Sequence, residues 1–140
     1  MYDKIDEMLE KPCYVADIFP ERIERGKIEQ YFDVEQYFLR NGEKTVLYRK
    51  FAAILLKLSC YFDFDVEFNG IWKRNPESAE LAELIRQCRD SDFYINIIIE
   101  ESLFVIGGGF LHMSLYGLSE RLMDMTRRLA ASEGIFLRKA

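Results

Sequence analysis

His112 is the only histidine in this 140-residue sequence, so one side chain alone titrates near neutral pH without help. It lies in an apolar segment, FLHMSLY at residues 110–116, where strand alternation would place His112, Ser114 and Tyr116 on one face. A serine and a histidine can act as nucleophile and base. Strand neighbours two residues apart are separated by roughly 6–7 Å, however, and no G-x-S-x-G turn surrounds Ser114. We therefore expect an ordinary half-buried sheet face, with a small hydrolase-like enzyme built around His112 as the alternative.

Cys13 and Asp17 are two further candidates for chemistry, because both lie in the strand-like segment CYVADIF at residues 13–19. A reactive thiol needs a positive neighbour or a helix N-terminus that favours the thiolate. Only Lys11 is close to Cys13 in the sequence, so a structural cysteine is the expected state. Cys60 and Cys88 sit among apolar helix residues, and the spacings match no zinc or redox motif. We expect three reduced, buried thiols.

Acidic side chains and a glycine turn are the remaining patterns that resemble ligand sites. Asp63, Asp65 and Glu67 alternate along one strand face, but no calcium-loop pattern accompanies them, so a solvated face is expected. The glycines at 107–109 precede Phe110 rather than a Lys-Ser or Lys-Thr pair and a helix, as a phosphate loop requires. They predict a turn with positive φ. We expect no metal site and no cofactor.

Aromatic residues crowd the segment YFDVEQYFL, residues 31–39, which we predict to be a short helix. Its aromatic side chains are Tyr31, Phe32, Tyr37 and Phe38, and Trp72 in a later connection could join them. A nine-residue helix cannot bury side chains that point all around it, and exposed aromatic clusters mark partner surfaces. The alternative is that the central and N-terminal helices cover all of them. Both interpretations remain open.

Helical and strand periodicities give the elements that must position these residues. We predict helices over 1–10, 31–39, 44–61, from Pro76 to Cys88 and from Ser119 to Gly134, and strands at 13–19, 64–68 and 135–137. Asn75 and Ser119 are the expected N-caps of the last two helices. Three apolar segments, 93–99, 103–106 and 110–116, are joined by links too short for parallel pairing. The prediction is one α+β domain, residues 1–140. It contains an antiparallel β-meander (about residues 93–116) in a mixed sheet of five to six strands, with helices packed mainly on one face.

Composition and net charge indicate which classes of partner are disfavoured and which cellular location to expect. The chain is 49% hydrophobic and 31% charged, which is typical of a globular domain, and its net charge of −5 disfavours nucleic acid and anionic membranes. The N-terminus lacks the apolar region of a signal peptide, and the longest apolar stretch, 51–56, is too short to span a bilayer. We expect a cytoplasmic protein.

Three segments, KPCYVADIFPE, QYFDVEQYFL and MSLYGLSERLMDMTRRLAASEGIFLRK, resemble a family of small uncharacterised proteins from anaerobic Gram-positive bacteria. The resemblance covers most of the chain and rests on two features: a strand that ends at a proline, and a strand–helix–strand arrangement in the last segment. It departs from the Asn-Pro-Asp helix start of relatives at Gly117-Leu118-Ser119. The resemblance implies no activity, cofactor or catalytic residue. We therefore expect a non-catalytic binding or protein-interaction module, with homodimerisation as one concrete version and a small-molecule ligand left open.

Overall fold

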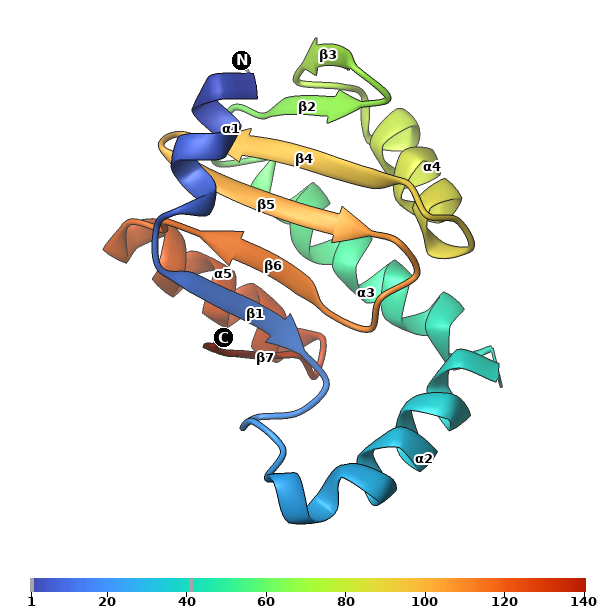
Figure 1. The fold of residues 1–140 in the computed structure, drawn as a ribbon. Coiled ribbons are helices and arrows are strands. Elements are labelled where there is room, and N and C mark those ends of the chain that lie inside the picture. Colours follow the sequence, from blue (N-terminus) through green and yellow to red (C-terminus); the bar gives the residue numbers. More distant parts are fainter. Residues whose placement is uncertain (1, 41) are drawn as a thin grey trace.

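A seven-stranded sheet forms the centre of the protein in the computed structural model, which describes residues 2–40 and 42–140 (Figure 1). Its order is β3-β2-β4-β5-β6-β1-β7, and every neighbouring pair is antiparallel. The strands are β1 (Cys13–Asp17), β2 (Asp65–Phe68), β3 (Ile71–Arg74), β4 (Tyr94–Ile99), β5 (Ser102–Gly107), β6 (Met113–Tyr116) and β7 (Phe136–Lys139). The α+β class and the β4–β5–β6 meander are confirmed.

The sheet differs from the prediction in two respects: it has seven strands, and it is antiparallel rather than mixed. The extra strand is β3, where the sequence predicts a connection containing Trp72. Asn69 and Gly70, with φ of 53° and 80°, make the tight hairpin that joins β2 to β3. Four residues are too few for a reliable alternation signal, so the strand exists mainly because this hairpin folds it back onto β2.

Three helices cover one face of the sheet: α3 (Glu43–Leu58), α4 (Ser78–Arg89) and α5 (Glu120–Ser132) (Figure 1). Their apolar stripes meet the inward side chains of the central strands in the main core, in which Phe51, Ile97 and Phe104 are fully buried. The Ser119 hydroxyl accepts a hydrogen bond from the Leu122 backbone N–H at 3.2 Å and caps α5, as predicted. This arrangement agrees with helices packed mainly on one face.

The opposite face of the sheet is only partly covered. The short helix α1 (Tyr2–Leu9) crosses it, and Ile5 and Met8 pack on Ile98 and Leu103 in a second, smaller cluster (Figure 1). Partial coverage is compatible with an antiparallel sheet, which can leave one face in water. The side chains beyond α1 on this face therefore remain available for contact, and we call this surface the open face.

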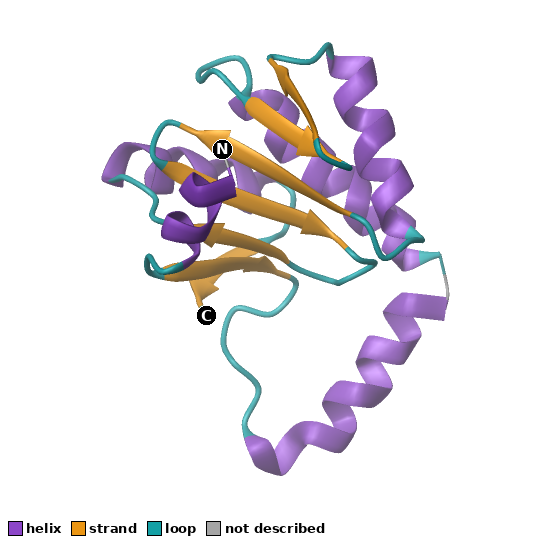
Figure 2. Ribbon diagram, turned by 45° about the horizontal axis from the view of Figure 1, so that its top comes forward, coloured by secondary structure: helices purple, strands orange, loops and turns teal. Residues whose placement is uncertain are grey.

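Helix α2 (Ile28–Arg40) projects from the body, preceded by the 3₁₀ turn η1 (Arg25–Lys27) (Figures 1 and 2). It is longer than the predicted 31–39 helix because Ile28 and Arg40 extend the same amphipathic pattern at the two ends. Among the described residues, each helix is too short or too polar to cross a bilayer.

Two local predictions are wrong. Asn75 was expected to cap α4. Instead it adopts a left-handed conformation (φ 46°) before Pro76, and α4 begins at Ser78. Cys60 was expected to be buried, but α3 ends at Leu58, so this thiol lies beyond the helix and is exposed.

Candidate functional site

The candidate residues from β6 and β1 meet on the open face. Strand pairing sets Cys13 opposite Tyr116 and Val15 opposite Ser114, so alternation places Cys13 and Asp17 on the same side as Ser114 and Tyr116. His112 precedes β6 and turns toward the same side, where it shares a hollow with Ser114 and Tyr116. The shared face predicted for these three residues is therefore present.

A hollow of about 420 Å³ lies on the open face, between α1 and the N-terminal end of β6. The strands contribute Tyr94, Asn96, Ser114 and Tyr116 to its lining, and the connection between β5 and β6 contributes Phe110 and His112. Ile5 and Leu9 of α1 form a wall. Tyr94 and Phe110 were not predicted to belong to a site. Their signal was alternation, because Tyr94 lies two residues before Asn96 and Phe110 two residues before His112.

His112 is held by ring contact rather than by a hydrogen-bonding partner. Its imidazole stacks on Phe110, with ring centroids 5.7 Å apart and planes 18° apart. Burial lowers the pKa of His112; the Asp17 carboxylate opposes that effect. Within residues 2–40 and 42–140, no hydrogen bond joins His112 to Ser114 or to any other side chain. The neutral imidazole is favoured, and the nucleophile–base arrangement of a hydrolase is not assembled in this conformation.

Cys13 and Asp17 have structural partners. The Cys13 thiol donates to the Tyr14 carbonyl oxygen at 3.5 Å. Burial first, and then the nearby Cys13 side chain, raises the pKa of Tyr116. Arg138 of β7 donates from Nη2 to Asp17 Oδ2 at 2.8 Å, and the Ile18 backbone N–H donates to Asp17 Oδ1 at 2.7 Å. Both carboxylate oxygens of Asp17 are therefore engaged.

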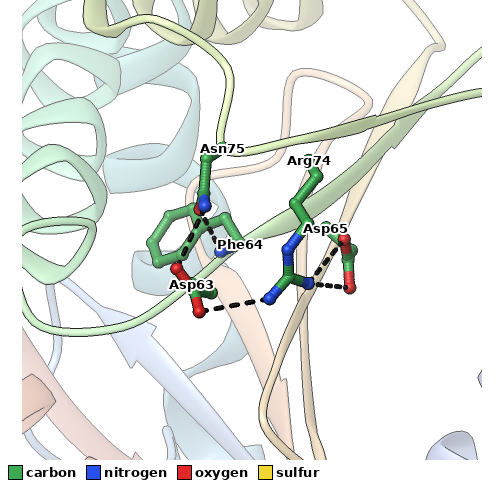
Figure 3. A network of polar contacts seen from close by, with 5 residues as sticks. All are labelled: Asp63, Phe64, Asp65, Arg74 and Asn75. Atoms are coloured by element: carbon green, nitrogen blue, oxygen red, sulfur yellow. Dashed lines mark hydrogen bonds and ion pairs between the residues drawn. The ribbon is translucent and has the colours of Figure 1, made fainter.

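The expected solvated face is wrong for Glu67, which is buried where the Gly70 N–H and the Asn96 amide donate to its carboxylate. Asp63 and Asp65 pair with a neighbouring guanidinium (Figure 3). Arg74 donates from Nη1 to both oxygens of Asp65 and from Nη2 to Asp63, and Asn75 donates to the other Asp63 oxygen at 3.0 Å. Asn75 also accepts from the Phe64 N–H at 2.8 Å. These contacts lock the start of β2 to the end of β3. In the part of the chain that the structure describes, no three His, Cys, Asp or Glu side chains group as a metal site would require.

The glycine turn after β5 is confirmed, with φ of 136°, 64° and 70° at Gly107, Gly108 and Gly109. The N–H of Gly108 donates to the Phe93 carbonyl oxygen at 2.8 Å, and that of Gly109 to the Cys88 carbonyl oxygen at 3.2 Å. A Cβ on Gly107 would overlap the Phe93 carbonyl oxygen. The turn therefore fastens two backbone segments together, and these two amides are not directed at a phosphate.

The predicted aromatic group divides into three parts. Phe32 and Tyr37 are 53% and 55% exposed, whereas Phe38 packs on the main core. Tyr31 lies against Phe19, with ring centroids 5.8 Å apart, and donates to Glu35 at 3.0 Å. Burial first, and then this acidic acceptor, raises the pKa of Tyr31 to about 12. Trp72 does not join this group, because it packs with the α1 cluster on the open face.

A second hollow, of about 550 Å³, separates α2 from the body. Its lining is charged, with Glu35 on α2 facing Lys44, Arg89, Asp90 and Asp92. Phe110 borders both hollows. The two hollows are therefore neighbours that share this residue.

Comparisons with known proteins provide no independent indication of function. No family model matches the sequence, and searches of curated proteins and of solved structures find no match. The resemblance to a bacterial family stays a prediction. Function must therefore be inferred from the residues themselves.

Proposed function

We propose that the protein is a non-catalytic interaction module that self-associates through α2. The supporting observation is that α2, which is described over its whole length, buries none of its thirteen side chains. Its main packing partners are α3 and η1, its neighbours along the chain. Such a helix has a larger apolar surface than its own fold covers.

Helix physics makes this exposure informative. Isolated helices shorter than about 12–15 residues are marginal in water, and most helical stability in proteins comes from packing an apolar face. Phe38 and Leu39 anchor one end of α2 to the core, while Ile28 and Phe32 remain 46% and 53% exposed toward the other end. At 100° per residue these two side chains lie on one side of the helix. A partner that packs on Ile28 and Phe32 would stabilise the projecting half.

A second copy of the chain is the proposed partner. In a two-fold dimer the same patch serves both subunits, so one apolar side of α2 is sufficient to build the interface. A hydrolase-like alternative would need a general base positioned by a second polar group. His112 has no such hydrogen bond in the described residues, so this alternative has less support. The three cysteines are free, which supports the cytoplasmic location that belongs to the same proposal.

Sedimentation velocity tests the proposal directly. We expect the wild-type protein to be dimeric at tens of micromolar and Phe32→Ser to be monomeric, because serine removes an exposed ring from the patch. Tyr61→Ser is the matched control, since Tyr61 is 58% exposed and lies outside α2. A monomeric wild type, or equal weakening by both substitutions, would contradict self-association through α2.

A further inference from the structure

We propose that the hollow on the open face is a binding site for a small, uncharged, planar aromatic molecule that carries a carboxamide or a similar hydrogen-bonding group. This inference concerns a surface that the α2 proposal does not use. The ligand proposal is tested by binding and the α2 proposal by oligomeric state, so either can fail without the other.

Charge is the first argument. In a chain with 31% charged residues, none of the ten described residues that line this hollow is Asp, Glu, Lys or Arg. The neighbouring hollow beside α2 is lined by both acidic and basic side chains, including Glu35, Lys44 and Arg89. Water solvates charged groups strongly, so an uncharged wall discriminates against an ionised ligand. The lining therefore selects a neutral molecule.

Ring geometry is the second argument. Phe110 and His112 are stacked almost in parallel, and Tyr94 lies 6.1 Å from Phe110 with its plane tilted by 41°. Tyr94 and Phe110 are still 42% and 50% exposed, although the fold buries many other large apolar side chains. Exposed ring faces beside an apolar wall of Ile5 and Leu9 favour stacking with another flat ring. Burial lowers the pKa of His112 and so favours the neutral imidazole, which can stack without introducing a charge.

Hydrogen-bonding groups are the third argument. Asn96 donates from Nδ2 to Glu67 Oε2 at 2.9 Å, and Glu67 is itself held by the Gly70 N–H at 2.8 Å. A carboxylate only accepts, so Glu67 fixes the Asn96 amide and leaves its Oδ1 as the acceptor for a ligand. Ser114 adds a hydroxyl that can donate or accept. An amide offers both an N–H and a carbonyl oxygen to such a pair.

Size is consistent with this class of ligand. Small-molecule pockets usually enclose about 300–1,000 Å³, and this hollow encloses about 420 Å³. One or two fused rings with a short substituent would fill it. Because the hollow is open on one side, we expect single-ring probes to bind weakly, with dissociation constants on the order of millimolar.

NMR titration of the full chain with benzamide tests the inference. We expect saturable shifts of backbone amides in residues 94–96, 105–107 and 110–116. Benzoate, which has the same ring with a negative charge, should bind at least about tenfold more weakly. Cyclohexanecarboxamide, which keeps the amide and loses the flat ring, should also bind more weakly.

Two substitutions of equally exposed phenylalanines complete the test. Phe110→Ala should weaken benzamide binding about fivefold through loss of the stacking face. Phe93→Ala is the matched control, because Phe93 is 52% exposed and does not line the hollow, and it should change binding less than twofold. The proposal is overturned if benzamide shifts do not saturate, if benzoate binds equally well, or if the two substitutions act alike. It is also overturned if the same amides shift on simple dilution of the protein, since a second copy would then occupy the hollow.

Discussion

Replacing Asp17 with Asn tests the ion pair that joins the first strand to the last. Arg138 Nη2 lies 2.8 Å from Asp17 Oδ2, and the two side chains are only 21% and 11% exposed. Asparagine keeps the shape of the side chain and an oxygen that can accept from the Ile18 N–H. It removes the negative charge, however, and leaves the Arg138 guanidinium largely desolvated without a counter-charge.

The size of the effect follows from the separation and the burial. Two unit charges about 4 Å apart attract by about 4 kcal/mol at an effective dielectric constant of about 20. Removing one partner of a fully buried pair lowers the free energy of unfolding by about 3–5 kcal/mol. Because water still reaches part of both side chains, we expect Asp17→Asn to lower it by about 2–3 kcal/mol. A double-mutant cycle with Arg138→Met should give a coupling energy of about 2 kcal/mol.

Urea denaturation followed by circular dichroism, at one fixed protein concentration, measures these free energies. The control cycle uses Asp124 and Arg128 on α5, which form a pair at 3.0 Å with both side chains 66% exposed. Exposed pairs one helical turn apart couple by about 0.3–0.5 kcal/mol. If the coupling energy between Asp17 and Arg138 is no larger than that between Asp124 and Arg128, the ion pair between β1 and β7 contributes no more than an exposed surface pair. That result would refute the reasoning.

Three other predictions follow from single residues. Gly107→Ala should lower the free energy of unfolding, measured by urea denaturation, by at least about 2 kcal/mol, because φ is 136° and the new methyl group overlaps backbone atoms. Gly26→Ala is the control, because a methyl group there would meet nothing within 4 Å, and it should change this free energy by less than about 1 kcal/mol. Exposed Cys60 should react with a thiol reagent in the folded protein. Buried Cys88, whose pKa is raised by burial to about 11, should react only on unfolding, and labelling of both at the same rate would contradict the packing of α4. The lowered pKa of His112 means that the unfolded chain binds the proton more tightly. The free energy of unfolding of the wild-type protein should therefore fall as the pH drops below about 6.5. Urea denaturation at pH 7 and at pH 5.5 measures this fall, and His112→Gln should lack the part of it that protonation of His112 causes.

Local signals in the sequence predicted much of the fold. The stripe of α3, the Ser119 cap and the glycine turn depend on residues within a few positions of one another, so periodicity and turn chemistry are sufficient to find them. The short strand β3 was missed because four residues between a tight turn and Asn75 carry little periodic signal. Cys60 was misplaced because an apolar stripe does not specify the residue at which its helix ends.

The candidate site depends on contacts that no local pattern encodes. Alternation was enough to group His112, Ser114 and Tyr116, but the proximity of Cys13 and Asp17 to them requires β1 to pair with β6. The sequence of α2 likewise could not show that Phe38 packs inward while Phe32 does not, since this depends on how α3 continues after residue 42.

The place of β1 between β6 and β7 has a consequence for how the chain folds as it is made. Asp17 and Arg138 are 121 positions apart, and the final N–H of Ala140 donates to the Cys13 carbonyl oxygen. A ribosome adds about 5–20 residues per second, so the first strand waits on the order of ten seconds for both of its neighbours. The meander and the helices behind it can associate earlier through shorter loops. We therefore expect β1 and β7 to dock last, as a step that no nascent fragment lacking residues 136–140 can complete.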